Sequence, residues 1–209
     1  MATSNDLVLF DAPGGPELVG FLEAKLQEVG LQARQPTAVF LTSTDDEAIS
    51  GLRTLLDRTG CDVLVSKPGV ERIKTLCPTA TSVHDEDALA TQQRWPVKAL
   101  PLQGRGKAPM AYRVDCHGKT VLLSGPFLSK MGRGQREMRT LVAAMSEPGG
   151  DAEAYLDSLV ALANLRVDVW LPATPVDGQN ANVYGDEWTE VVAINRMIIE
   201  RWMETARRK

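Results

Sequence analysis

The chain has 209 residues, of which 44% are hydrophobic and 24% are charged, and its formal net charge is −4. This length and apolar content suit one domain with a sizeable core. The net charge gives no general attraction to nucleic acid or to an anionic membrane, and no apolar run approaches the roughly 20 residues that cross a bilayer. We therefore expect a single domain over residues 1–209, with no nucleic-acid or membrane partner.

Cysteine and histidine are scarce. The three cysteines are an odd number without CxxC spacing, which predicts reduced thiols. The N-terminus lacks the basic segment and apolar core of a signal peptide, so we expect a cytoplasmic protein. With only two histidines, His84 and His117, the chain has no means of building a His-rich metal centre by itself.

The first part of the chain alternates between strand and helix patterns. Apolar runs predict strands at residues 6–12, 37–43 and 61–66. Apolar residues at helical spacing follow these runs and predict helices at 16–29, 49–60 and 70–76. This alternation is typical of α/β layering.

The middle and end of the chain have a different pattern. Residues 97–104 and 110–125 read as strands, and the second stretch predicts a hairpin that turns at His117-Gly118. We expect a loop at 129–138, rich in glycine and arginine. Further along, the pattern predicts a helix at 151–165, a strand at 167–173, a polar loop at 176–188 and a last helix carrying Trp188 to Met203.

Five short segments occur in an order that resembles the metallo-β-lactamase fold family. They are "LVLFDAP", "VFLTSTDDEAISGL", "LQGRGKAPMAY", "KTVLLSGPFLSKMGRG" and "VDVWLPATP". The order looks most like the branch of the hydroxyacylglutathione hydrolases. The resemblance implies an α/β fold, a metallo-β-lactamase-like αββα sandwich. Because the chain begins almost at the strand that ends in aspartate, we expect the first strands of the sandwich to be lacking: the sheet is smaller, an upstream segment is absent, or a partner completes the sheet.

The metal positions of that family hold other residues in this chain. The resemblance places Ser43, Asp45, Glu47 and Ala48 at the positions of the His-x-His-x-Asp-His signature, Arg105 at the third histidine, Pro126 at the bridging aspartate and Thr174 at the last histidine. Alanine and proline side chains carry no donor atom, and a guanidinium does not ligate a cation. Only Asp11, which supports the ligands in that family, keeps its residue type. We therefore expect no metal and no cofactor.

The acids at 45–47 have a purely structural interpretation. Thr44 as N-cap with Glu47 three residues later is the pattern of a capping box. Asp45 and Asp46 in the first turn suit the positive end of the helix.

Two other uses of these acids stay open. Asp45, Glu47 and Asp11 could together hold Mg²⁺ or Ca²⁺, which bind carboxylate oxygens. Alternatively, Arg105 could supply the positive charge that a metal supplies in active relatives, forming an ion-pair cluster with Asp11, Asp45 and Glu47.

Three functional interpretations follow. The first is a metal-free, catalytically inactive domain that acts as a binding or structural module, with a protein partner or a second copy of the chain pairing at an open sheet edge. The second is a hydrolase of esters or thioesters with a non-standard site around Asp11, Asp45, Glu47 and Arg105. The third, a bare scaffold, would show an exposed apolar sheet edge near residues 7–10.

Overall fold

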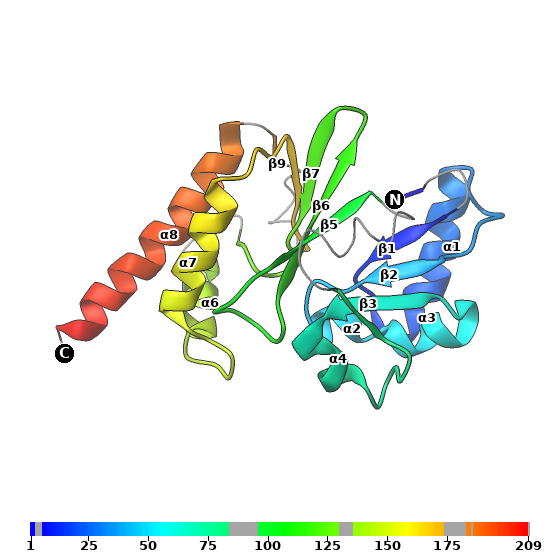
Figure 1. The fold of residues 1–209 in the computed structure, drawn as a ribbon, viewed down its shortest axis with the longest axis horizontal. Coiled ribbons are helices and arrows are strands. Elements are labelled where there is room, and N and C mark those ends of the chain that lie inside the picture. The colour runs from blue at the N-terminus through cyan, green and yellow to red at the C-terminus, as the bar shows by residue number, and fades with distance from the viewer. Residues whose placement is uncertain (3–5, 84–95, 130–135, 174–182, 185, 209) are drawn as a thin grey trace. The chain divides into compact units, whose positions relative to one another are not determined.

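The structure is a computed structural model that describes residues 1–2, 6–83, 96–129, 136–173, 183–184 and 186–208. The chain divides into two compact units, Met1–His84 and Asp85–Lys209. Each unit contains one sheet and its own helices (Figure 1). Within the described ranges, no helix combines the length and the apolar character needed to cross a bilayer.

The first unit is built on a parallel sheet with strand order β1-β2-β3-β4. Its first three strands follow the predicted apolar runs and helices connect them, which confirms the predicted alternation, while the fourth strand was not predicted. The strands are β1 (Val8–Phe10), β2 (Ala38–Phe40), β3 (Asp62–Ser66) and β4 (Thr81–Val83); the helices are η1 (Gly15–Glu17), α1 (Leu18–Glu28), α2 (Asp46–Ile49), α3 (Leu52–Thr59) and α4 (Lys67–Ile73).

Both faces of this sheet carry buried side chains. On one face, Val39 and Val63 pack in a cluster with Leu52 and Leu55 of α3. On the other face, Phe40 is fully buried and stacks on Phe10 with ring centroids 5.6 Å apart. Burial on both faces explains why these strands read as continuous apolar runs rather than as alternating patterns.

The outer side of β1 is occupied where the chain begins. The Met1 amino group donates to Val8 O at 2.8 Å, and Val8 N donates to Met1 O at 2.8 Å. Leu7 and Val8 are buried, with 5% and 0% of their surfaces exposed. The exposed apolar edge expected of a bare scaffold is therefore not found at these two residues.

The second unit is built on a mixed sheet with strand order β5-β6-β7-β8-β9. The pairs β5–β6, β6–β7 and β8–β9 are antiparallel, and β7–β8 is parallel. His117 (φ 49°) and Gly118 (φ 74°) form the hairpin turn, as predicted. The strands are β5 (Val97–Pro101), β6 (Met110–Cys116), β7 (Lys119–Leu123), β8 (Val169–Leu171) and β9 (Val183–Tyr184); the helices are α6 (Arg136–Ala144), α7 (Ala152–Ala163) and α8 (Asp186–Arg207).

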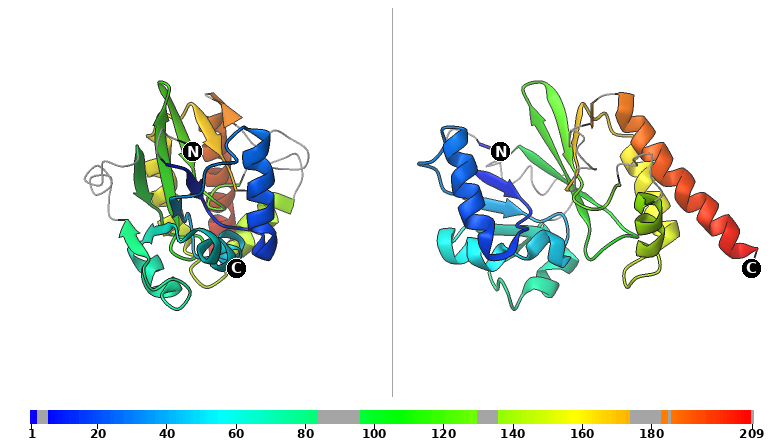
Figure 2. Two further views of the ribbon diagram at one scale, coloured as in Figure 1. Left: turned by 90° about the vertical axis from the view of Figure 1, so that its right-hand side faces the viewer. Right: turned by 180° about the vertical axis from the view of Figure 1, so that it is seen from behind.

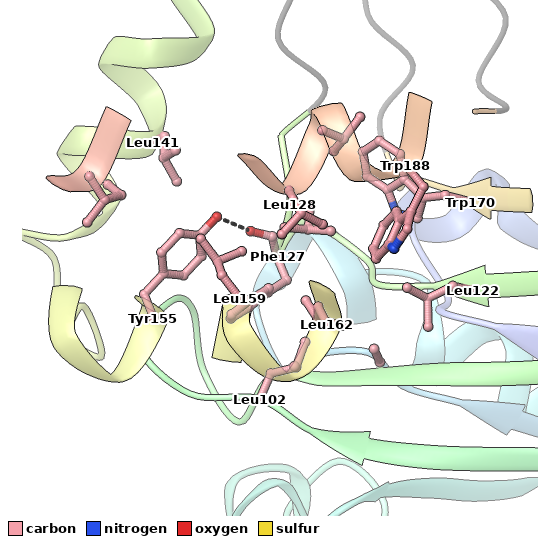
Figure 3. Packing of buried hydrophobic residues seen from close by; sticks show 14 of the residues in the cluster. Leu102, Leu122, Phe127, Leu128, Leu141, Tyr155, Leu159, Leu162, Trp170 and Trp188 are labelled. Atoms are coloured by element: carbon pink, nitrogen blue, oxygen red, sulfur yellow. Dashed lines mark hydrogen bonds between the residues drawn. The ribbon is translucent and has the colours of Figure 1, made fainter. Parts of the chain in front are cut away.

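Helices α6, α7 and α8 of this unit lie side by side (Figures 1 and 2). Their buried side chains form one cluster with residues of β6, β7 and β8. Figure 3 shows its aromatic centre, where Trp170 packs against Trp188 and Phe127 packs against Tyr155, with ring centroids 6.1 Å and 4.9 Å apart respectively. The apolar face predicted for the last helix is confirmed by the burial of Trp188 and Ile199.

Several element boundaries differ from the sequence predictions; for example, β9 and the start of α8 lie within the polar loop predicted at 176–188. The expected loop at 129–138 was wrong at its end, because Arg136 already begins α6. Val29 was predicted on the buried face of the first helix but follows α1 and is 66% exposed. Helix α4 begins at Lys67 rather than at residue 70, because Pro68 is well tolerated in a first helical turn.

Gly104 lies where the loop after β5 touches α7. Its φ is +90°, and a Cβ atom at this position would lie 2.2 Å from Tyr155 N and 2.3 Å from Asp151 O. Gly104 O also accepts a hydrogen bond of 3.0 Å from Asp151 N. The loop therefore approaches the first turn of α7 so closely that no side chain fits between them.

We expect Gly104→Ala to lower the free energy of unfolding by about 3 kcal/mol or more, because it combines a left-handed φ with a backbone collision. Gly118→Ala is the matched control. Gly118 has φ +74° with nothing within 4 Å of the added Cβ, so its cost should stay near ~1 kcal/mol. Urea unfolding of both variants measures the difference, and equal losses would contradict the close approach.

Candidate functional site

Asp11 stands at the end of β1 and ties it to the segment that follows β2. Its backbone adopts φ 61°, a conformation that few residues other than glycine and asparagine adopt readily. Its Oδ1 accepts a 2.7 Å hydrogen bond from Thr42 N, and its Oδ2 accepts a 2.6 Å hydrogen bond from Thr42 Oγ1. One carboxylate thus fixes both the backbone and the side chain of Thr42.

Burial raises the pKa of the Asp11 carboxyl from 3.8 to about 6, although the two hydrogen bonds from Thr42 act in the opposite direction. Part of the residue reaches solvent, while the carboxylate itself is deeply buried. The cost of removing the charge from water therefore outweighs the hydrogen bonds that favour it.

A carboxylate that accepts a hydrogen bond from a hydroxyl is also the arrangement of a base with a nucleophile. The pKa of about 6 for Asp11 would suit a general base. Thr42, however, is only 2% exposed, so a substrate does not reach its hydroxyl in this conformation. The pair is better understood as a structural lock between two strand ends.

The acids at 45–47 begin a helix, but one residue later than predicted. The N-cap of α2 is Asp45, with extended backbone angles and no side-chain cap hydrogen bond, so the predicted capping box from Thr44 is wrong. Thr44 is buried instead. Asp46 and Glu47 occupy the first turn and are exposed, where the helix dipole favours negative charge, as expected.

Two other signature positions of the first unit serve local structure. Ser43 is 1% exposed, and its Oγ accepts a hydrogen bond of 3.1 Å from Asp45 N. Ala48 is 3% exposed, and its carbonyl accepts a 2.7 Å hydrogen bond from Ala12 N. A small residue at Ala48 lets the loop after β1 pack directly on α2.

In the second unit, Arg105 is half-buried and bonded to the segment after β7. Its Nη1 donates to Phe127 O at 2.7 Å and to Ser129 Oγ at 3.0 Å. Pro126 lies in the turn that Phe127 N closes by donating to Ser124 O at 3.1 Å. Thr174 lies outside the described residues.

A buried polar network holds the same segment from the helix side. Asn195, which is fully buried, accepts a 3.2 Å hydrogen bond from Ser129 N and donates 2.8 Å bonds to Ser129 O and Val191 O. The Tyr155 hydroxyl lies 3.0 Å from Asn195 Oδ1 and 3.3 Å from Phe127 O, so its single proton is shared between these two acceptors; Figure 3 shows the contact with Phe127. Burial raises the pKa of Tyr155, and the Arg105 charge opposes this shift.

The sequence did not single out Asn195, Tyr155 or Ser129 as site residues. One signal was available for Asn195. It lies midway between Val191 and Ile199, four residues from each, so helical spacing puts a polar amide on the apolar face of the last helix. A polar residue at such a position needs buried hydrogen-bond partners.

The residues at these positions do not fit a zinc centre. Ala48 and Pro126 carry no donor atoms, and Arg105 is a cation. In the described part of the chain, no three His, Cys, Asp or Glu side chains come together in a group that could hold a metal ion. The Mg²⁺ or Ca²⁺ site considered for Asp11, Asp45 and Glu47 is therefore not assembled.

The predicted ion-pair cluster stays a prediction. Both Asp11 oxygens are bonded to Thr42 within the first unit. Arg105 Nη1 is bonded within the second unit. These bonds use neither every donor of the guanidinium nor every lone pair of the Asp11 carboxylate, so they do not test the predicted cluster of Asp11, Asp45, Glu47 and Arg105.

A groove of about 600 Å³ lies on the first unit, between α1, α3 and the loop at 32–36. Its lining includes Arg58 and Glu23, which form an exposed ion pair of 3.1 Å with one another. Among the residues that line it, none belongs to the predicted site. The groove is therefore separate from the strand ends that carry the altered metal positions.

The raised pKa of Asp11 predicts a pH-dependent stability. Protonation of the carboxyl is favoured in the folded state. The ionisation of Asp11 therefore does not lower the free energy of unfolding below pH 3.8, and lowers it by up to about 3 kcal/mol once the pH has risen through 6. We expect wild type to lose this amount relative to Asp11→Asn between pH 4 and pH 7. Urea unfolding at both pH values measures it, and a constant difference would contradict it.

Asn195→Ala should lower the free energy of unfolding by about 2–4 kcal/mol, because it leaves Ser129 N, Ser129 O and the Tyr155 hydroxyl without their buried partner. Asn164→Ala is the control. Asn164 is exposed at the end of α7, so we expect a change within about 0.5 kcal/mol. Chemical denaturation compares the two, and similar losses would count against the network.

Known proteins resemble this chain in structure but not detectably in sequence. No family model and no curated protein matches the sequence. Among solved structures, a subclass B3 metallo-β-lactamase with an active-site glutamic acid matches 100% of this chain and 84% of its own, with a TM-score of 0.71 and 16% identity.

Two further solved structures agree with this match. MEM-A1, a subclass B3 metallo-β-lactamase from a soil metagenome library, matches 100% of this chain and 89% of its own (TM-score 0.73, 14% identity). A metallo-β-lactamase of Cronobacter sakazakii with a HARLDQ motif matches 99% of this chain and 90% of its own (TM-score 0.70, 17% identity). The chain therefore has the metallo-β-lactamase fold, which confirms the predicted fold class.

Proposed function

We propose that this chain is a metal-free, catalytically inactive domain of metallo-β-lactamase fold that acts as a binding or structural module. The observation that carries the proposal is that residues at the altered metal positions take part in packing and in local hydrogen bonds. Ala48 is buried against the loop after β1, Pro126 shapes a turn, and Arg105 bonds to Phe127 and Ser129. Residues engaged in packing and backbone hydrogen bonds do not supply the lone pairs that a catalytic metal needs.

We expect elemental analysis to find well below one metal ion per chain after expression with added zinc and gel filtration. The purified protein should also fail to hydrolyse ester, thioester and β-lactam substrates above the rate of a mock preparation. The β-lactam is included because the solved structures named above are β-lactamases. Stoichiometric metal, or turnover that Asp45→Ala abolishes, would overturn the proposal.

The second candidate function is a hydrolase of esters or thioesters with a site around Asp11, Asp45, Glu47 and Arg105. The observation in its favour is the pKa of about 6 at Asp11, which would let this carboxyl exchange a proton near neutral pH. Under this alternative, Asp11→Asn abolishes turnover and the rate follows a single ionisation near pH 6. Under the leading proposal, wild type and Asp11→Asn are equally inactive.

We also propose that a structural or binding role involves another chain, either a different protein or a second copy, at the β1 edge of the first sheet. Support comes from the position of β1 at the end of the strand order. Met1 already pairs with Val8, so the contact would have to use the remaining part of this strand or displace Met1. Light scattering on the purified chain distinguishes a monomer from a self-paired dimer.

A further inference from the structure

Arg105 is a cation with a fixed position. The loop that carries it is held against α7 by the close approach of Gly104 and by the hydrogen bond from Asp151 N to Gly104 O. Its guanidinium is anchored through Nη1 to Phe127 O and Ser129 Oγ. An exposed arginine side chain is flexible, and ordering it on ligand binding costs conformational entropy. Because Arg105 is already anchored, much of this cost is removed.

The guanidinium has no counter-charge within its own unit. Both anchoring partners are neutral, and among the described residues of the second unit no carboxylate lies within ion-pair distance of Arg105. Asp151, whose backbone contacts the same loop, uses its carboxylate Oδ1 to accept hydrogen bonds from Glu153 N and Ala154 N at the start of α7. A half-buried cation whose described neighbours in its own unit are neutral favours an anion beside it.

The donors of Arg105 beyond its bonds to Phe127 and Ser129 suit one class of anion, although the guanidinium also has a side-chain hydrogen bond with Tyr155. The two anchoring bonds both come from Nη1, and a guanidinium also carries N–H groups on Nε and Nη2 that point along one edge in parallel. That edge matches the two oxygens of a planar carboxylate.

We propose that Arg105 binds the carboxylate group of a small anionic ligand. The inference rests on the proposed function, because it assigns a ligand class to a binding module that uses an arginine where active relatives use a metal. Recognition depends on the paired donors of the guanidinium, with Phe127 and Ser129 as positioning residues. The buried network around Asn195 keeps those two residues in place.

The test uses the full chain and titrates sodium malonate, a dicarboxylate, at constant ionic strength against sodium chloride, with calorimetry and thermal unfolding as readouts. We expect saturable binding and a rise in Tm for wild type. Arg105→Gln should weaken binding by about tenfold or more, because it removes the paired charge-assisted donors. Arg201→Gln, which removes an exposed arginine on α8, should bind as wild type does.

Arg105→Lys keeps the charge and one donor to Phe127 O, so it guards against loss of binding through misfolding; it should bind more weakly than wild type and retain its fold. Binding that is absent in wild type, or unchanged in Arg105→Gln, would overturn the inference. A double-mutant cycle gives a further outcome that would overturn the inference. If Arg105 is energetically coupled to Asp45 and Glu47 and malonate does not bind, the acids of the chain itself hold the guanidinium.

A chelator separates this inference from the proposed function. Malonate bound by Arg105 is insensitive to EDTA, which supports the inference. Malonate binding that EDTA abolishes would mean that the anion sits on a metal, which overturns both the inference and the metal-free proposal. If elemental analysis finds metal, the proposed function is overturned. If calorimetry finds no malonate binding, the inference is overturned.

Discussion

The segment from Phe127 to Ser129 is the point on which the second unit depends, because three elements donate hydrogen bonds to it or receive them from it. Arg105 contacts it from the loop after β5, Tyr155 from α7 and Asn195 from α8. These bonds lie among the aromatic side chains of the largest cluster, where an unpaired polar group would be expensive. The network therefore fixes the path of the chain after β7 relative to the helices, and it fixes Arg105 at the same time.

In the first unit, a smaller set of hydrogen bonds also fixes the path of the chain at the strand ends. The Asp11 carboxylate bonds to Thr42 twice, and the backbone around it joins Ala12 to Ala48 and Gly51. The end of β1, the segment after β2 and the start of α2 are thereby connected without any ion. In both units, side-chain and backbone hydrogen bonds hold the strand-end loops that carry the altered metal positions.

The likeness to subclass B3 metallo-β-lactamases is therefore a likeness of backbone. At 14–17% identity, this likeness concerns the fold and not the function. An arginine stands at one of the positions that the sequence resemblance assigned to a metal ligand, and it bonds to Phe127 and Ser129. Function on this fold follows the residues at the strand ends, and here Ala48, Ser43 and Arg105 are engaged in packing and hydrogen bonding.

The sequence alone determined the alternation of strands and helices, the hairpin at His117-Gly118 and the absence of donor atoms at Ala48 and Pro126, because apolar spacing, turn preference and side-chain chemistry are local properties. It missed the start of α6 and placed the α2 cap on Thr44, since several polar residues in a row offer competing caps. Only the tertiary structure decided that Arg105 bonds to Phe127 and Ser129 and that Asn195 joins them. Those contacts connect residues 22 to 66 positions apart, and no local pattern encodes which distant partner a buried polar group will meet.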